Sequence, residues 1–279
     1  MSSLDGKVLL LSGGSRGIGL AIALRAARDG AAVALLAKTA TPHPRLEGTV
    51  HTAAAAIEAA GGEALPIVGD VRDEGSVDVA VAATIERFGA IDIVVNNASA
   101  IDLSPSLDLA ARRYDLMQAI NARGAFLLAR AAVPHLRRAA NPHVLTLSPP
   151  LSFEPRWLGA HLGYTISKYS MSLVTLGMAA EFEADGIAFN SLWPRTLIAT
   201  AAVRNVVGGE AALARARKPA IVADAAHAIL TRPAGERNGE LLLDEDVLRE
   251  AGVEDFAPYA VEPGSELELD LFVTAEPPA

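Results

Sequence analysis

The chain contains no cysteine, few aromatic residues and no excess of positive charge. Without cysteine there are no disulfides, thiolate metal sites or cysteine nucleophiles, and the composition fits a reducing compartment. The formal net charge of -9 argues against a nucleic-acid partner, which needs a basic surface. No apolar run reaches the ~18 residues of a membrane span, and the N-terminal residues show no apolar signal region. We therefore expect a cytoplasmic protein with no membrane span and no nucleic-acid partner.

Apolar residues are abundant: 51% of the 279 residues are hydrophobic and 20% are charged. Strand-like runs of leucine or β-branched residues alternate with alanine-rich helical stretches, a pattern typical of a parallel sheet with helices on both faces. A chain of this length commonly forms one such domain. We predict the α/β fold class, with a Rossmann-type, doubly wound sheet of seven parallel strands at residues 7–12, 32–37, 64–69, 91–95, 143–147, 187–192 and 241–243.

Two proline-containing segments, residues 39–48 and 149–163, interrupt this alternation. We expect both to be loops near the carboxyl ends of strands, where sheets of this kind bind ligands. Beyond Val261 the chain is acidic and contains proline. We predict one domain over residues 1–261 and an acidic C-terminal tail, residues 262–279, that is frayed or packs on a partner.

A glycine-rich turn joins the first predicted strand to the first helix, in the run Ser12-Gly13-Gly14-Ser15-Arg16-Gly17-Ile18-Gly19. Glycine suits this junction because a backbone without Cβ atoms turns tightly and approaches a pyrophosphate closely, and the helix N-terminus attracts its charge. The spacing differs from the Gly-x-Gly-x-x-Gly fingerprint. Its position in the alternating chain nevertheless favours a dinucleotide over a turn that binds nothing.

Tyr164 and Lys168 stand one helical turn apart and are expected to share a helix face. A free phenol has a pKa near ~10, and a neighbouring ammonium lowers that pKa by favouring the phenolate. The pair therefore predicts a tyrosine that donates or accepts a proton near neutral pH.

Four features in this order resemble the motifs of the short-chain dehydrogenase/reductase family: the glycine turn, Asn96-Asn97-Ala98, Asn121 and Tyr164 with Lys168. The resemblance covers roughly residues 6–245. Within the family the chain is most similar to hydroxysteroid dehydrogenase-like proteins, through Ala37-Lys38-Thr39-Ala40, Pro42-His43-Pro44, Ser148-Pro149-Pro150-Leu151 and Trp193-Pro194. Some of those relatives carry a sterol-carrier domain, which we do not expect in a chain of this length.

The resemblance implies a nicotinamide cofactor. Family members that use NAD typically end the second strand with an acidic residue, where this chain has Ala37. Because Lys38 and Arg16 are expected to meet a 2′-phosphate instead, we predict NADP(H). The cofactor-binding residues implied by the resemblance are Gly13, Ser15, Arg16, Gly17, Ile18, Gly19, Lys38, Asp70, Val71, Asn97, Ala98, Tyr164, Lys168, Pro194 and Leu197.

By the same resemblance, Tyr164 transfers the proton, Lys168 lowers its pKa and holds the nicotinamide ribose, and Asn121 orders a helix and a proton-relay water. The family's serine, which polarises the substrate carbonyl, has no clear counterpart, because Pro149 or Leu151 stands in its place. We favour Ser148, which directly follows the strand, with Ser152 as the alternative; a third reading is that neither contacts substrate. Loss of such a donor weakens catalysis.

We predict an NADP(H)-dependent oxidoreductase that moves hydride between nicotinamide and a carbonyl or secondary alcohol. An apolar, lipid-like or alicyclic substrate is suggested by Leu197, Ile198, Val203, Val206 and Val207. The alternatives are reduction of the C=C bond of an enoyl thioester and a non-catalytic NADP-binding regulatory or scaffold protein.

Three smaller expectations complete the sequence reading. Arg195, in place of a glycine after Pro194, is either salt-bridged or binds an anionic substrate group. The histidines show no metal-ligand spacing, so no metal is expected. The family likeness implies a homotetramer or homodimer.

Overall fold

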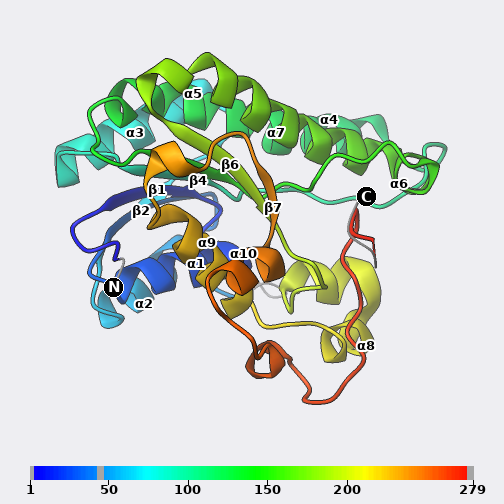
Figure 1. Cartoon of the computed structure of the whole chain (residues 1–279). Helices are drawn as coiled ribbons and strands as arrows, with labels where there is room; N and C mark the ends of the chain where they lie inside the picture. Colours follow the sequence, from blue (N-terminus) through cyan, green and yellow to red (C-terminus); the bar gives the residue numbers. More distant parts are fainter. Residues whose placement is uncertain (1–2, 43–46, 275–279) are drawn as a thin grey trace.

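A parallel sheet of seven strands forms the centre of the molecule (Figure 1). The computed structural model describes residues 3–42 and 47–274. The strand order is β3-β2-β1-β4-β5-β6-β7, and every neighbouring pair is parallel. This confirms the predicted fold class, and each strand lies within two residues of its predicted bounds. The strands are β1 (Val8–Ser12), β2 (Ala32–Ala37), β3 (Glu63–Val68), β4 (Ile93–Asn96), β5 (His143–Thr146), β6 (Ala188–Trp193) and β7 (Leu241–Leu243).

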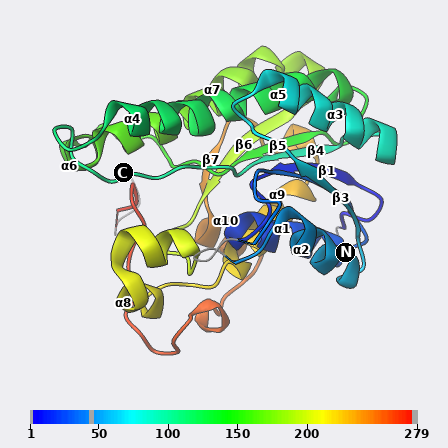
Figure 2. The same cartoon turned by 180° about the vertical axis from the view of Figure 1, so that it is seen from behind.

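Helices cover both faces of the sheet, as Figures 1 and 2 show from opposite sides. One face carries α1 (Gly17–Ala27), α2 (Val50–Ala59), α9 (Ala220–Leu230) and α10 (Asp244–Glu250), and the other carries α3 (Glu74–Phe88), α5 (Gly124–Leu136) and α7 (Leu162–Glu181). Shorter helices follow strands β4 to β6: α4 (Ala111–Met117), the π-helix η1 (Gln118–Arg123), α6 (Pro155–Ala160), the π-helix η3 (Val203–Gly208) and α8 (Gly209–Ala214). Single 3₁₀ turns are η2 (Glu183–Asp185), η4 (Ala234–Glu236) and η5 (Ala257–Tyr259). Over residues 3–42 and 47–274, no helix combines the length and apolar character needed to cross a bilayer.

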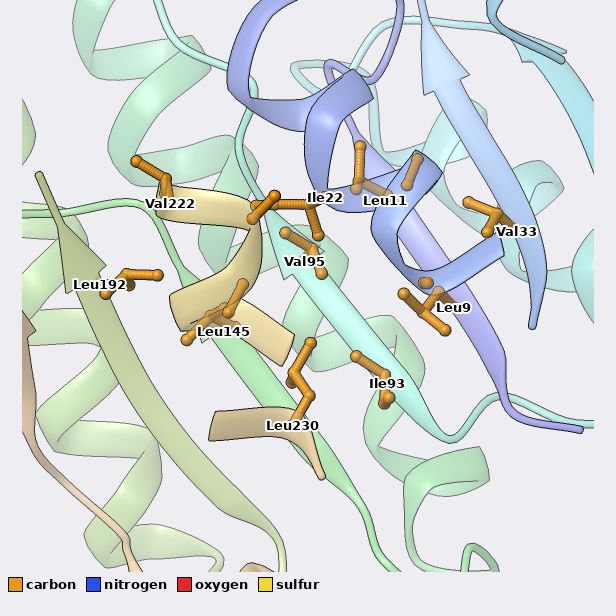
Figure 3. Close-up of a cluster of buried hydrophobic side chains, with 14 of the residues drawn as sticks. Leu9, Leu11, Ile22, Val33, Ile93, Val95, Leu145, Leu192, Val222 and Leu230 are labelled. Atoms are coloured by element: carbon orange, nitrogen blue, oxygen red, sulfur yellow. The ribbon is translucent and has the colours of Figure 1, made fainter. Parts of the chain in front are cut away.

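The core has two layers because successive strand side chains point to opposite faces. Leu9 and Leu11 of β1 pack with Ile22 of α1 and Leu230 of α9 on one face (Figure 3), and Leu10 packs on the other. All three leucines of β1 are fully buried. Burial on both faces explains why the strands appear in the sequence as continuous apolar runs. Burial of each such side chain stabilises the fold by roughly 1.5–3 kcal/mol.

The segment 149–163, expected to be a loop, contains helix α6, and α7 begins within it at Leu162. The loop prediction is therefore wrong for residues 155–160 and 162–163, while residues 149–154 have no regular structure. Pro155 occupies the first turn of α6, where its missing N–H costs nothing and its fixed φ favours the helix. Residues 39–42 and 47–48 of the other predicted loop have no regular structure, while His43 and Pro44 lie outside the described residues.

Residues 262–274, which we call the C-terminal strap, pack against their own chain. The strap passes α8 and ends near α6 (red in Figure 1), and Figure 2 shows the same course. The Leu197 N–H donates a hydrogen bond to the Glu268 carbonyl at 2.9 Å, and Phe272 is only 5% exposed. The frayed alternative does not describe these residues, because apolar burial and backbone bonds hold them, while packing on a partner stays a prediction. Residues 275–279 lie outside the described residues.

Candidate active site

A cavity of about 1030 Å³ opens at the carboxyl ends of the central strands. The glycine turn, the ends of β2 and β4, helix α7, the segment after β6 and the strap all contribute to its walls. Every predicted cofactor-binding residue lines it except Gly19. The structure therefore brings together residues that are widely separated in sequence.

The glycine turn is packed tightly against β4. Gly13 has φ +75°, and a Cβ atom there would lie 2.8 Å from the Cα of Ala98. A Cβ atom at Gly19 would lie 2.4 Å from Asn97 Nδ2. That amide donates to the carbonyls of Ser12 at 3.2 Å and Gly13 at 2.9 Å, so it fixes the shape of the turn. Gly19 thus supports the turn from behind, whereas Asn97 both supports it and lines the cavity.

The N-terminus of α1 is open toward the cavity. Arg16 is the N-cap residue, no side chain caps the first turn, and that turn has no acidic residue. At Gly17, with φ +58°, a Cβ atom would lie 3.4 Å from Thr200 across the cavity. The free N–H groups and the helix dipole therefore fit an anionic group such as a pyrophosphate.

Two cations stand beside the end of β2. The Arg16 guanidinium donates to the carbonyls of Glu47 at 2.7 Å and Gly48 at 2.8 Å. Lys38 Nζ lies 3.1 Å from Asp70 Oδ2, and its side chain is 57% exposed. The hydrogen bonds of Arg72 are the largest cause of a strongly lowered pKa at Asp70, which is therefore ionised. This corner of the cavity therefore holds two positive charges. Arg16 is anchored by backbone carbonyls, and Lys38 is accessible to solvent.

Tyr164 and Lys168 lie on the buried face of α7, 6% and 2% exposed. Lys168 Nζ donates to the Leu147 carbonyl at 2.6 Å and sits 4.9 Å from the centroid of the Trp193 ring. Burial lowers the pKa of Lys168 to about 7. Burial, and secondly the charge of Asp270, raise the pKa of Tyr164. The expected lowering of the phenol pKa is thus not found, because the ammonium is bound to the end of β5 and desolvation dominates.

Asn121 lies in the π-helix η1 and is fully buried. Its side-chain oxygen accepts from the Ala100 N–H at 2.7 Å, and its amide donates to the Ala100 carbonyl and to Ser167 Oγ, both at 2.9 Å. Asn121 does not line the cavity. It ties the segment after β4 to helix α7, and its role in a proton relay stays a prediction.

Among the described residues, no hydrogen bond joins either candidate serine to the Tyr164 phenol. Ser148 Oγ is buried without a hydrogen-bond partner among the described residues. Ser152 Oγ accepts from the Glu154 N–H at 3.3 Å, and neither serine lines the cavity. Pro149 is buried, and its carbonyl accepts from Ser172 Oγ at 2.6 Å. The structure thus leaves Ser148 Oγ without a hydrogen-bond partner among the described residues, and which of the two serines, if either, contacts the substrate stays a prediction.

Arg195 forms ion pairs with Asp246 and, at 3.8 Å, with Glu245. Its side chain is 18% exposed and does not line the cavity. This confirms the salt-bridged alternative for Arg195.

Sequence reasoning missed the contribution of the strap. Asp270 and Leu271 line the cavity together with Tyr164, Lys168 and Trp193. The sequence carried a signal, since residues 266–271 alternate strictly between acidic and apolar, as a half-buried strand does. An isolated antiparallel bridge joins Thr196 to Leu269, although Leu269 is 39% exposed and the acidic Asp270 lines the cavity.

Comparison with known proteins gives consistent matches. A family model described as short chain dehydrogenase matches residues 7–210. Hydroxysteroid dehydrogenase-like protein 2 of Danio rerio is 51% identical over 274 residues, which cover 98% of this chain and 65% of that protein. The chain thus spans less than two thirds of that relative's length.

Two solved structures are also similar. A putative dehydrogenase from Xanthomonas campestris is 57% identical with a TM-score of 0.94, covering 98% of this chain and 99% of the other. The NADH-dependent reductase A1-R′ complexed with NAD is 26% identical with a TM-score of 0.70, covering 86% of this chain and 95% of the other.

Proposed function

Because the chain belongs to the short-chain dehydrogenase/reductase family, we propose that it is an NADP(H)-dependent oxidoreductase acting on a carbonyl or secondary alcohol of an apolar molecule. One observation carries the proposal. Tyr164, Lys168 and the open N-terminus of α1 line the same cavity of about 1030 Å³. A phosphate-binding helix end and a proton-transfer group therefore serve one site.

The residues present fit a nicotinamide dinucleotide. The turn from Gly13 to Gly17 and the free amides of α1 suit the pyrophosphate, since side chains there would fill the space. Asp70, Val71 and Ala98 line the part of the cavity proposed for the adenosine, and Pro194 and Leu197 line the part proposed for the nicotinamide. When bound, the nicotinamide supplies or accepts a hydride at C4.

NADP(H) is proposed over NAD(H) because of the charges beside β2. The strand ends at Ala37, so it places no carboxylate where ribose hydroxyls are bound in NAD-dependent relatives. Lys38 and Arg16 line this end of the cavity, and two cations favour a 2′-phosphate. The similar reductase A1-R′ is named NADH-dependent, so this preference rests on residues of this chain.

Tyr164 is proposed to give its proton to the substrate oxygen in reduction and to take it back in oxidation. Burial raises the pKa of the phenol, which keeps it protonated and thus ready to donate. Lys168 is held by the Leu147 carbonyl and supplies positive charge to the cavity below its pKa of about 7. Asn121 is proposed to position α7 through Ser167, beside the hydrogen bond that Gln118 Nε2 of the same π-helix donates to the Gly163 carbonyl at 3.3 Å.

The substrate is proposed to be apolar, lipid-like or alicyclic. The segment after β6 lines the cavity with apolar side chains, namely Leu197, Ile198, Val203, Val206 and Val207. Val206 is 42% exposed, so apolar surface is available there for a ligand to cover.

A second candidate is reduction of the C=C bond of an enoyl thioester. It is favoured by the position of Ser148 and Ser152 outside the cavity, since that reaction depends less on a hydroxyl at the substrate carbonyl. Initial rates with NADPH and matched ketone and enoyl-thioester substrates separate the two candidates. A regulatory, non-catalytic protein would bind NADPH and turn over neither.

We also propose a cytoplasmic homodimer or homotetramer. The absence of cysteine fits a reducing compartment. Exposed apolar side chains on α5 and α7, namely Phe126, Leu162, Ile166 and Leu173, are suited to a subunit interface. Light scattering of the purified protein tests the assembly, and a monomer at all concentrations would contradict it.

The proposed function is tested with Tyr164→Phe, which removes the proton and keeps the ring. We expect kcat to fall by about 10²–10⁴, the usual contribution of a general acid, while NADPH affinity is unchanged. Tyr114→Phe is the matched control, because Tyr114 lies on α4 outside the cavity. An unchanged rate in Tyr164→Phe would remove the proposed mechanism.

A further inference from the structure

The strap forms a wall of the active-site cavity and is held there by backbone bonds. The Asp270 N–H donates to the Arg195 carbonyl at 3.0 Å, and Trp193 Nε1 donates to the Leu271 carbonyl at 2.8 Å. These two bonds attach Asp270 and the next residue, Leu271, to the end of β6 and the residues that follow it. The position of Asp270 beside the cavity is therefore fixed by its own backbone and its neighbour's.

Asp270 lies close to the proposed reaction centre. It lines the same cavity as Tyr164 and Lys168. The ring of Phe272, two residues further on, stacks on the ring of Tyr164 with centroids 6.2 Å apart. Trp193, which binds the Leu271 carbonyl, lies under the Lys168 ammonium. Two independent contacts thus bring the Asp270 carboxyl toward the phenol and the ammonium.

The side chain of Asp270 has little to bind within the protein. Oδ1 accepts from the Leu271 N–H at 2.7 Å. Over residues 3–42 and 47–274, no cation lies within ion-pair distance of this carboxyl. The cavity that Asp270 lines is also lined by the apolar side chains of Leu147, Trp193 and Leu271. A polar group in such surroundings has unused hydrogen-bonding capacity that faces the cavity.

We propose that Asp270, in its neutral carboxylic acid form, is the catalytic residue that donates a hydrogen bond to the substrate carbonyl oxygen. It thereby takes the role of the family's serine, since neither Ser148 nor Ser152 lines the cavity. This inference rests on the proposed carbonyl reduction. In that reaction the carbonyl carbon gains the hydride, the oxygen gains the Tyr164 proton, and Asp270 keeps its own proton throughout.

The charged and titratable groups around Asp270 are consistent with a neutral acid near physiological pH. The pKa of Asp270 is raised to about 7: burial raises it most, the Leu271 N–H lowers it, Asp244 at the start of α10 and Glu268 on the strap raise it, and Lys168 on α7 lowers it. Tyr164 on α7 also faces it. A carboxyl group kept neutral by an apolar site is an established kind of hydrogen-bond donor to a developing oxyanion.

The first experiment compares Asp270→Leu with Asp270→Asn in the full-length protein, with a ketone substrate and NADPH. Leucine fills the space without a donor, and we expect kcat to fall by about 10²–10³, as for loss of one oxyanion donor. Asparagine keeps an N–H donor, so most of the activity is retained. Glu266→Gln, which removes a charge from an exposed position of the same strap, is the control and leaves the rate unchanged.

The second experiment measures kcat/KM against pH. If the neutral acid is the active form, the activity of the unmodified protein is full below pH 7 and falls as pH rises through the Asp270 pKa of about 7. Asp270→Asn loses this descent. If Lys168 caused the descent, Asp270→Asn would keep it and move it to lower pH, because Asp270 raises the Lys168 pKa; that result would overturn the proposal.

Two further results separate this inference from the function on which it rests, and a third measurement checks folding. Equal activity of Asp270→Leu and the unmodified protein, with Tyr164→Phe inactive, would overturn the role of Asp270 alone. A comparable loss in Ser148→Ala or Ser152→Ala, but not in Asp270→Leu, would return the role to a serine. Thermal unfolding with and without NADPH checks folding, and if Asp270→Leu does not fold, the pH profile of Asp270→Asn still decides.

Discussion

The two sides of the active-site cavity are built in different ways. The phosphate-binding part of the cofactor side is a single turn that holds Gly13, Arg16 and Gly17, and Asn97 buttresses it. The substrate side joins α7, the segment after β6 and the strap, which are far apart in the chain. The first side is therefore specified by local backbone geometry, and the second depends on the packing of distant segments.

The cores of the two sides differ in the same way. Leu11 and Ile22, behind the glycine turn, belong to the large apolar layer between the sheet and α1. On the substrate side, Phe272 is packed by Trp157, Tyr164, Tyr169 and Trp193 in a separate cluster. Loss of one aromatic anchor should loosen the substrate side and leave the cofactor side intact.

Phe272→Ala is expected to have the largest effect, and on the substrate side alone. Truncating a buried phenylalanine costs about 3–5 kcal/mol, so the strap should open at least a hundredfold more often. Hydrogen exchange of the Leu197 and Asp270 amides, which are bonded across this contact, measures the opening. Phe153→Ala is the control, because Phe153 is 81% exposed. Faster exchange throughout β1 and α1 would contradict the independence of the two sides.

Gly13→Ala tests the cofactor side and should have the next largest effect. The left-handed backbone costs a residue with a Cβ about 1–2 kcal/mol, and the contact with the Ala98 backbone adds about 1–3 kcal/mol. We expect lower stability in urea and loss of NADPH binding, measured by fluorescence titration.

Gly6→Ala separates the two causes. Gly6 also has positive φ, +66°, but nothing lies within 4 Å of a Cβ there. Gly6→Ala should therefore lose only the stability that the left-handed backbone costs, about 1–2 kcal/mol, and should still bind NADPH. Equal losses in both variants would mean that close approach of the backbone at Gly13 is unimportant.

Lys38→Ala should have the smallest effect and tests whether the charge of Lys38 selects NADPH over NADH. We expect NADPH to bind about tenfold more weakly, while NADH binding changes little, because only NADPH carries the 2′-phosphate. Arg72→Ala is matched to it: Arg72 also binds Asp70 but does not line the cavity. If both variants weakened NADPH and NADH alike, the charge of Lys38 would not select the cofactor.

The same contrast explains what could be read from the sequence. The sheet was predictable because apolar runs and alanine-rich stretches report burial locally, and β2 and β7 have the predicted bounds. The residues of the glycine turn were predictable because Gly13 and Gly17 need conformations that glycine favours. Helix α6 was missed because prolines suggested a loop, although Pro155 begins a helix.

The substrate side could be read less well because its contacts are long-range. The spacing of Tyr164 and Lys168 predicted that they share a helix face. It did not predict that Lys168 donates a hydrogen bond to the Leu147 carbonyl. Asp270 was missed because its place depends on pairing with the segment after β6. Burial beside Tyr164, which sets the direction of the pKa shift, is likewise a property of the assembled fold.

The bridge between Thr196 and Leu269 has a kinetic consequence. Leu197, which is proposed to contact the nicotinamide, lies on the segment after β6, and both this segment and the strap line the cavity. Their backbones are joined, so one cannot swing away without breaking the bonds of the other. Exchange of cofactor and departure of product therefore share a single opening motion, and the frequency of that motion is an upper limit on turnover.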